Sequence, residues 1–124
     1  MEPFIFREAF VTLATLHLDA TMAFYKALLG SDPQIYVPDI YAEFLLPGLK
    51  LGIFQPKTEN YHEFGAHGKG IMSLCFEVEN LEVAIAHLTA LGYPPPNQPM
   101  TASHGREIYA YDPDGNRLIL HQAA

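Results

Sequence analysis

The chain lacks tryptophan and is poor in cysteine and in basic residues. It has one cysteine, Cys75, and only seven lysines and arginines among 124 residues. A single cysteine excludes an intrachain disulfide, and its place in the apolar run from 71 to 76 predicts a buried small hydrophobic side chain. The fourteen acidic residues give a net charge of -7. Because nucleic acid requires clustered lysine and arginine, we expect no nucleic-acid partner.

Membrane and targeting signals are also absent. The first seven residues lack the basic end and the long apolar core of a signal peptide, and no apolar run is long enough to span a bilayer. We therefore expect a cytoplasmic protein without a membrane partner. Apolar residues make up 49% of the chain and charged residues 17%, which excludes a disordered chain. A length of 124 residues predicts a single domain over 1–124.

The first half of the chain predicts a strand, a helix and three further strands. Hydrophobic alternation indicates a strand at 8–15, and helical spacing indicates a helix at 20–29, begun by Asp19 as N-cap and ended by Gly30. Short strands are expected at 34–37, 41–46 and 50–54, separated by turn residues. The polar, glycine-containing stretch 55–70 is expected to be an ordered loop.

The second half repeats this order of elements. A strand at 71–78, an N-cap at Asn80 and a helix at 81–91 that stops at Gly92 precede weak strand material and a final hairpin. The repeat predicts an α+β fold of two tandem β-α-β-β-β modules, about 8–55 and about 70–122. The alternative from the same pattern is an ordinary α+β sandwich without a true repeat.

The final hairpin allows a register to be predicted. Its two strands, 107–112 and 116–121, flank Pro113-Asp114-Gly115, a three-residue loop that is typical of a type I turn followed by a bulge with Gly115 at positive φ. Asp112 should then pair with Asn116. Continuing this register places Tyr111 opposite Arg117, Tyr109 opposite Ile119 and Glu107 opposite His121. Side chains at alternate positions share one face of the sheet.

Three segments together resemble the vicinal oxygen chelate superfamily, which includes glyoxalase I, bleomycin-resistance proteins and extradiol dioxygenases. They are the helix Asp19–Gly30 with its Phe-Tyr…Leu-Gly pattern, the strand-helix unit that begins at Leu74 and runs to Gly92, and the turn Asp112–Asn116. The resemblance implies that the two modules form a curved mixed sheet around a cleft. It also implies that two such chains pair into a homodimer, with clefts within one chain or between two.

The metalloenzymes of that superfamily hold a divalent ion with His and Glu side chains on strand positions that face the cleft. Carried over residue by residue, these positions fall near Phe10, near Ser73, on Ile119, and near Gly52 or Ile53. None is a good ligand for a divalent cation, and two place apolar bulk where donors would be needed. The resemblance therefore implies a metal-free protein without a cofactor, and leaves enzyme activity uncertain, with binding favoured over catalysis.

We expect the cleft to bind a small organic molecule, which the protein would sequester or carry. Tyr109, Arg117 and His121 would fix its orientation against aromatic and apolar side chains. Under the alternative interpretation, these residues form the solvated face of an ordinary hairpin. The ligand-binding residues predicted in this way are Phe10, Thr12, Ser73, Cys75, Glu107, Tyr109, Tyr111, Arg117, Ile119 and His121.

Six histidines keep other hypotheses open. A metal-dependent lyase, isomerase or dioxygenase of the same superfamily could use displaced ligands, namely His17, His62, His67 or His121. The cross-strand pair His121 and Glu107 could act as a general base and the group that orients it, although a structural hydrogen-bonded pair is favoured. Ser73 has no adjacent residue that would activate it. A third hypothesis is a structural or interaction module whose cleft is filled.

Overall fold

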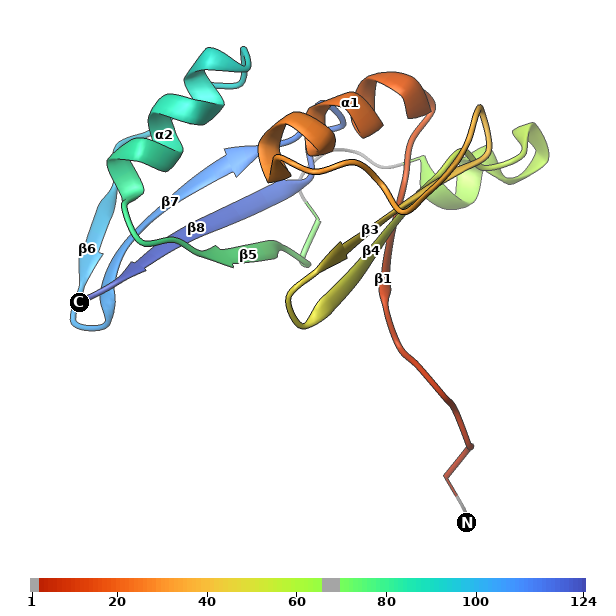
Figure 1. The fold of residues 1–124 in the computed structure, drawn as a ribbon, viewed down its shortest axis with the longest axis horizontal. Coiled ribbons are helices and arrows are strands. Elements are labelled where there is room, and N and C mark those ends of the chain that lie inside the picture. Colours follow the sequence, from red (N-terminus) through yellow and green to blue (C-terminus); the bar gives the residue numbers. More distant parts are fainter. Residues whose placement is uncertain (1–2, 66–69) are drawn as a thin grey trace.

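The computed structural model describes residues 3–65 and 70–124. Its elements follow the predicted order twice, with a 3₁₀ helix between the two modules (Figure 1). Module 1 comprises β1 (Val11–Ala14), α1 (Leu18–Leu29), β2 (Ile35–Val37), β3 (Tyr41–Leu46) and β4 (Leu49–Phe54). Module 2 comprises β5 (Leu74–Glu77), α2 (Leu81–Ala90), β6 (Met100–Ala102), β7 (Gly105–Tyr111) and β8 (Arg117–Ala123).

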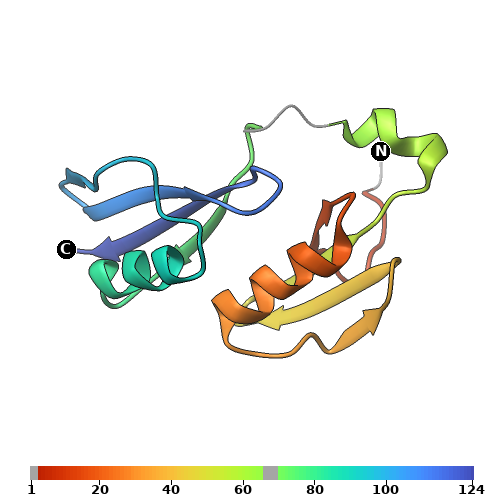
Figure 2. The same ribbon diagram turned by 90° about the horizontal axis from the view of Figure 1, so that it is seen from above.

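Each module forms its own four-stranded mixed sheet with the same strand order. The order is β1-β4-β3-β2 in module 1 and β5-β8-β7-β6 in module 2. In each sheet the first strand runs parallel to the last strand of its module, and the remaining pairs are antiparallel. The predicted α+β class with two β-α-β-β-β modules is therefore confirmed, and the modules lie side by side (Figure 2).

The local signals for helix ends are mostly confirmed. Gly30 adopts φ 69° and its N–H binds the carbonyl of Lys26, as expected for a glycine that ends a helix. The Asn80 side chain accepts a hydrogen bond from the N–H of Val83 at 2.9 Å. The predicted N-cap at Asp19 is wrong, because α1 begins two residues earlier than predicted and His17 occupies the N-cap position.

Other boundaries differ from the prediction. β1 and β5 are shorter than predicted, because only residues that pair with the last strand of the module belong to the ladder. The final hairpin strands extend over 105–111 and 117–123. The expected loop at 55–70 contains a 3₁₀ helix, Thr58–Phe64, and its residues 66–69, including His67, lie outside the described residues. Within the described residues, no helix has the length and apolar content needed to cross a bilayer.

Both helices lie on the same side of the sheets (Figure 1). Alternate strand residues face them and form the core, with Phe44, Leu51 and Ile53 in module 1 and Leu118 and Leu120 in module 2 almost completely buried. The residues between them point to the side opposite α1 and α2, where the Phe64 ring of the 3₁₀ helix packs on Phe54 at one end of module 1. We call this side of both sheets the open face.

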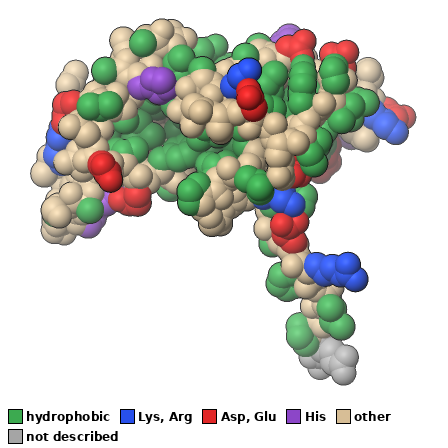
Figure 3. Space-filling view, viewed as in Figure 1, with side chains coloured by type: hydrophobic (Ala, Val, Ile, Leu, Met, Phe, Trp, Pro, Cys, Tyr) green, Lys and Arg blue, Asp and Glu red, His purple; other side chains and the backbone are tan. Residues whose placement is uncertain are grey.

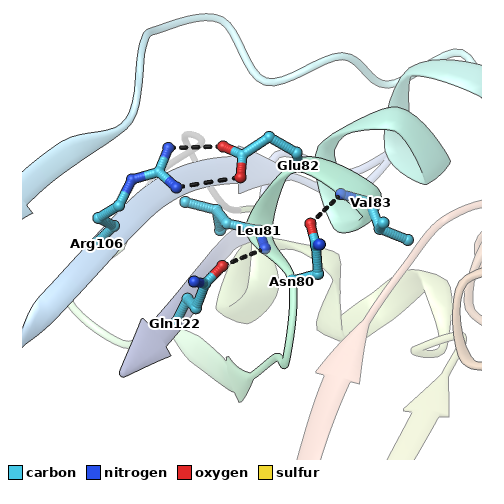
Figure 4. A network of polar contacts seen from close by, with 6 residues as sticks. All are labelled: Asn80, Leu81, Glu82, Val83, Arg106 and Gln122. Carbon is cyan, nitrogen blue, oxygen red and sulfur yellow. Dashed lines mark hydrogen bonds and ion pairs between the residues drawn. The ribbon is translucent and has the colours of Figure 1, made fainter. Parts of the chain in front are cut away.

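Polar contacts fix the start of α2 to β7 and β8 (Figure 4). Gln122 accepts a hydrogen bond from the N–H of Leu81 at 2.7 Å, so a side chain from β8 satisfies a backbone donor at the first turn. Arg106 on β7 forms a two-bond ion pair with Glu82, with distances of 3.1 and 2.6 Å. These contacts use the helix side of the sheet and leave the open face of module 2 unaffected.

The two modules are joined through α1 and the turn of the final hairpin. Tyr25 on α1 donates a hydrogen bond to Asp112 at 2.6 Å, and Thr21 donates to Asp114 at 2.8 Å. Asp112 is buried and also accepts bonds from the turn, two from backbone N–H groups and one from the Asn116 amide. Burial and the adjacent carboxylates raise the pKa of Tyr25, so its hydroxyl stays a donor.

Candidate functional site

The predicted hairpin register is confirmed and sets the order of side chains on the open face. The N–H of Asp112 binds the carbonyl of Asn116, and Gly115 has φ 85°. Tyr111 pairs with Arg117, Tyr109 with Ile119, and Glu107 with His121. β5 extends these rows, because Cys75 pairs with Ile119 and Glu77 with His121.

The open face of module 2 therefore carries three rows of different chemistry. The first is polar, with Ser73, Arg117 and Tyr111; the second is mainly apolar, with Cys75, Ile119 and Tyr109; the third is acid-base, with Glu77, His121 and Glu107. The six members on β7 and β8 are half-buried. Cys75 is exposed, so the predicted burial of this side chain is wrong. It belongs to the alternate set that points away from α2, whereas its neighbours Leu74 and Phe76 pack against the core.

A pocket of about 300 Å³ lies at the junction of the modules. It brings together three of the predicted ligand-binding residues, Thr12 from β1, Ser73 beside β5 and Arg117 from β8. Apolar side chains supply much of the remaining wall, including Val11, Leu13, Ile71, Met72 and Leu74. Phe10 does not line this pocket; it lies just before β1, with the Lys50 ammonium 5.1 Å from its ring centre.

Arg117 is held in place at the edge of the pocket. Its Nη1 donates to the carbonyl of Gly70 at 2.9 Å and to the Ser73 hydroxyl at 3.0 Å. Both bonds use Nη1, so among the described residues the N–H groups of Nε and Nη2 have no protein acceptor. Ser73, for which the sequence offered no neighbour, thus serves to position a guanidinium. A fixed guanidinium with unused donors is suited to binding a carboxylate, phosphate or phosphonate.

The positions that hold a metal in the metalloenzymes that the sequence resembles do not fit a divalent ion here. Ile119 offers only carbon, Phe10 offers a ring under a lysine, and the Ser73 hydroxyl is engaged by Arg117. The fourth position is Gly52, since Ile53 belongs to the buried core. Within residues 3–65 and 70–124, no group of three or more His, Cys, Asp and Glu side chains converges as metal ligands would.

In module 1 the space over Gly52 is filled by Tyr41. An ideal Cβ at position 52 would lie 2.7 Å from the Tyr41 hydroxyl. That hydroxyl donates to Glu43 at 2.7 Å, and the Gln34 amide donates to the other oxygen of Glu43. Glu43 is only 6% exposed although it points to the open face. Burial, together with the bond to Glu43, raises the pKa of Tyr41 to about 12.

His121 lies opposite Glu107 in the ladder but is hydrogen-bonded to other residues. Its Nδ1 is 2.7 Å from a carboxylate oxygen of Glu77, and its Nε2 is 2.9 Å from Nδ1 of His104. The hydrogen-bonded pair predicted for His121 and Glu107 is thus replaced by a hydrogen-bonded chain from Glu77 through His121 to His104. Sequence reasoning missed both partners, because Glu77 belongs to β5 and its proximity follows from parallel pairing with a strand 44 positions later.

Comparison with known proteins identifies the family. A family model described as the Glyoxalase/Bleomycin resistance protein/Dioxygenase superfamily matches residues 9–120. The chain belongs to this superfamily, which confirms the resemblance based on the first helix, the second strand-helix unit and the terminal turn.

Individual proteins resemble the chain over most of its length. A trivalent organoarsenical cleaving enzyme from Bacillus sp. (strain MD1) is 30% identical, over 87% of this chain and 68% of that protein. The solution NMR structure of an Agrobacterium tumefaciens protein is 32% identical over 97% of this chain and 99% of that chain, with a TM-score of 0.76. A fosfomycin resistance protein from Listeria monocytogenes, solved with Mn(II) and sulfate, has a TM-score of 0.73, 24% identity and coverage of 98% and 93%; this likeness concerns the fold alone.

Proposed function

We propose that the chain binds a small organic anion on its open face, without a metal at the positions that the superfamily's metalloenzymes use. The anionic group would sit against Arg117, and the apolar part would occupy the pocket at the module junction. The observation that supports this most directly is the guanidinium fixed by Gly70 and Ser73 beside an apolar pocket. Pockets that bind small molecules usually combine an apolar lining with a few placed polar groups.

The polarity of the open face supports the same conclusion. Next to Arg117 and outside the pocket, the second row adds the Tyr109 ring and the Ile119 side chain as further apolar surface for a larger ligand. A bound carboxylate or phosphonate can accept two parallel N–H bonds from a guanidinium, which gives orientation as well as affinity. Sequestration or carriage of such a ligand needs no further groups.

The test uses benzoate and phenylphosphonate as anionic probes and benzyl alcohol as the neutral control. Isothermal titration with wild type in the presence of a chelator should give binding of the anions and little binding of the alcohol. Arg117→Met should weaken anion binding about tenfold or more, the value of one charge-assisted bond. Arg106→Met is the matched control, because Arg106 is bound to Glu82 on the helix side and should leave binding unchanged.

Metal analysis of protein purified without chelator decides between this proposal and its main alternative. If probe binding depends on a stoichiometric divalent ion, the alternative of a metal-dependent enzyme with displaced ligands is supported. His→Ala changes at 17, 62, 67 and 121 would then locate the metal site. If no probe shifts the melting temperature, an interaction module with a filled cleft is the better description. A ligand at a hundredfold excess over its Kd should raise the free energy of unfolding by about 2.7 kcal/mol. Homodimer formation and a cytoplasmic location stay predictions.

A further inference from the structure

The third row of module 2 contains a continuous carboxylate-imidazole-imidazole chain. Glu77 comes from β5, His121 from β8, and His104 from the turn between β6 and β7. Successive heavy-atom distances are 2.7 and 2.9 Å. The His121 side chain is 17% exposed and the Glu77 side chain 72%, so the chain leads from a sheltered central ring toward solvent.

The hydrogen-bonding capacities of the three groups fix the direction of the chain. An ionised carboxylate only accepts, so Nδ1 of His121 carries the proton that Glu77 binds. Nε2 of neutral His121 is then an acceptor, and Nδ1 of His104 must donate to it. Nε2 of neutral His104 is left with a lone pair. His104 is exposed, so this lone pair is accessible to a ligand on the open face.

The backbone around position 105 is shaped for this chain. Gly105 has φ 139°, and an ideal Cβ there would lie 2.2 Å from the carbonyl of Gln122 and 3.0 Å from Nε2 of His121. Only glycine lets β7 start this close to β8 and to the imidazole. The two imidazole rings are stacked with centroids 5.0 Å apart, and the carbonyl of His104 accepts the N–H of Ala124 at 3.3 Å.

We propose that this chain is a metal-free general-base site, with His104 as the catalytic residue and His121 and Glu77 as positioning residues. It rests on the proposed function, since its substrates are small organic molecules on the same face. The substrate class is an organic compound with a weakly acidic C–H bond. Nε2 of His104 removes that proton while Nδ1 of His104 passes its own proton to Nε2 of His121. Glu77 stabilises the positive charge that then resides on His121.

The surroundings of His121 are consistent with this role. The groups that face it are Glu77 from β5, Glu107 from β7 and His104. The apolar second row, with Ile119 and Tyr109, lies beside the chain and can hold the body of a substrate. Arg117 lies further along the same strand at about 13 Å, four residues at roughly 3.3 Å each. A substrate with an anionic group at the far end could therefore contact both.

The test uses 5-nitro-1,2-benzisoxazole, which a general base converts without any co-reactant. Loss of the C3 proton to the base supplies the electron pair that forms the C–N triple bond, while the ring N–O bond breaks to release a phenolate. The probe carries no anionic group, so its conversion does not depend on Arg117. Wild type, assayed with a chelator, should exceed the same concentration of free imidazole about a hundredfold.

Variants separate catalysis from structure. His104→Gln should lose this excess over imidazole. Glu77→Gln should lower kcat but change KM little, because the His104 ring that removes the proton is still present. His17→Gln is the matched control, because His17 is an exposed histidine that is not part of the hydrogen-bonded chain. In nitrogen-15 NMR spectra, Glu77→Gln should also shift the His121 tautomer away from Nδ1–H. Equal rates for wild type and His104→Gln, a rate no greater than that of imidazole, or an unchanged tautomer would overturn the proposal.

Failure of the general-base proposal is distinguishable from failure of the proposed anion binding. If benzisoxazole conversion persists while benzoate and phenylphosphonate do not bind, only the anion site is wrong. If both anions bind through Arg117 but His104→Gln leaves conversion unaffected, the open face binds ligands and the general-base site is wrong.

Discussion

The two modules have the same strand order, yet their open faces differ in how polar groups are satisfied. In module 1, Glu43 is 6% exposed and is bonded by Tyr41 and Gln34, so the network closes on itself. In module 2, the Glu77 side chain is 72% exposed, and the chain that it begins ends in an accessible nitrogen of His104. One copy of the scaffold has a self-contained polar network, and the other presents polar groups to solvent.

A glycine makes each arrangement feasible, and the two glycines meet different neighbours. At Gly52 the nearest group is the hydroxyl at the end of the Tyr41 side chain, whereas at Gly105 it is a backbone carbonyl. The side chain can move but the carbonyl is fixed by the β7–β8 ladder. The group that lies above the glycine can therefore shift in module 1, whereas in module 2 it cannot.

The largest effect should come from Gly105→Ala. Positive φ and a contact with backbone at 2.2 Å act together, so we expect a loss of about 3–4 kcal/mol in the free energy of unfolding. Urea denaturation measures it. Gly48→Ala is the control, since its φ of 77° is also positive but no atom lies within 4 Å of its Cβ; this variant should lose only about 1 kcal/mol. Equal losses would contradict a steric role for position 105.

A smaller difference should separate Glu43→Ala from Glu77→Ala. Removing the buried carboxylate leaves a cavity and takes the acceptor from Tyr41 and Gln34, so we expect a loss of about 2–3 kcal/mol. Removing Glu77, whose side chain is largely in solvent, should change stability by less than about 0.5 kcal/mol. Guanidinium denaturation of both variants tests this contrast, and a reversed order would mean that module 2 holds the structural network.

The smallest effect concerns Tyr41→Phe and pH. At neutral pH the variant should lose about 1 kcal/mol, because Glu43 keeps only one donor. The pKa of Tyr41 is raised from 10.0 to about 12, so its stabilising contribution is complete below pH 10 and declines as pH rises from 10 to 12. Thermal melting across this range should show a steeper alkaline decline in wild type than in the variant. Parallel curves would contradict the assigned pKa direction.

Much of the fold could be predicted because its signals are local. Gly30 ends a helix through its own positive φ, Asn80 binds a backbone N–H three residues later, and the turn before Asn116 sets the hairpin register by its length. Such features depend on neighbouring residues alone. The N-cap at His17 was missed because Asp19 has the right chemistry for an N-cap but stands two positions too late.

The site could be predicted only in part, because its partners are far apart in sequence. Alternation along β8 correctly grouped Arg117, Ile119 and His121 on one face. The partners of these side chains come from the first strand of the module and from a turn, as with Glu77 and His104. The order of elements predicts that such strands are neighbours but not which side chains touch. The exposure of Cys75 likewise depends on which side of β5 faces α2.

Asp112 has a consequence for how this turn should be used in recognising proteins. Its carboxylate accepts four hydrogen bonds, three within the turn and one from Tyr25 of the other module. The bond from Tyr25 joins the two halves, the other three order the turn, and none involves the strand position at Ile119, where a metal ligand would stand. A search keyed on the sequence Asp-Pro-Asp-Gly-Asn will therefore collect catalysts and simple binders alike. The residue three positions after Asn116 is the more informative one for chemistry.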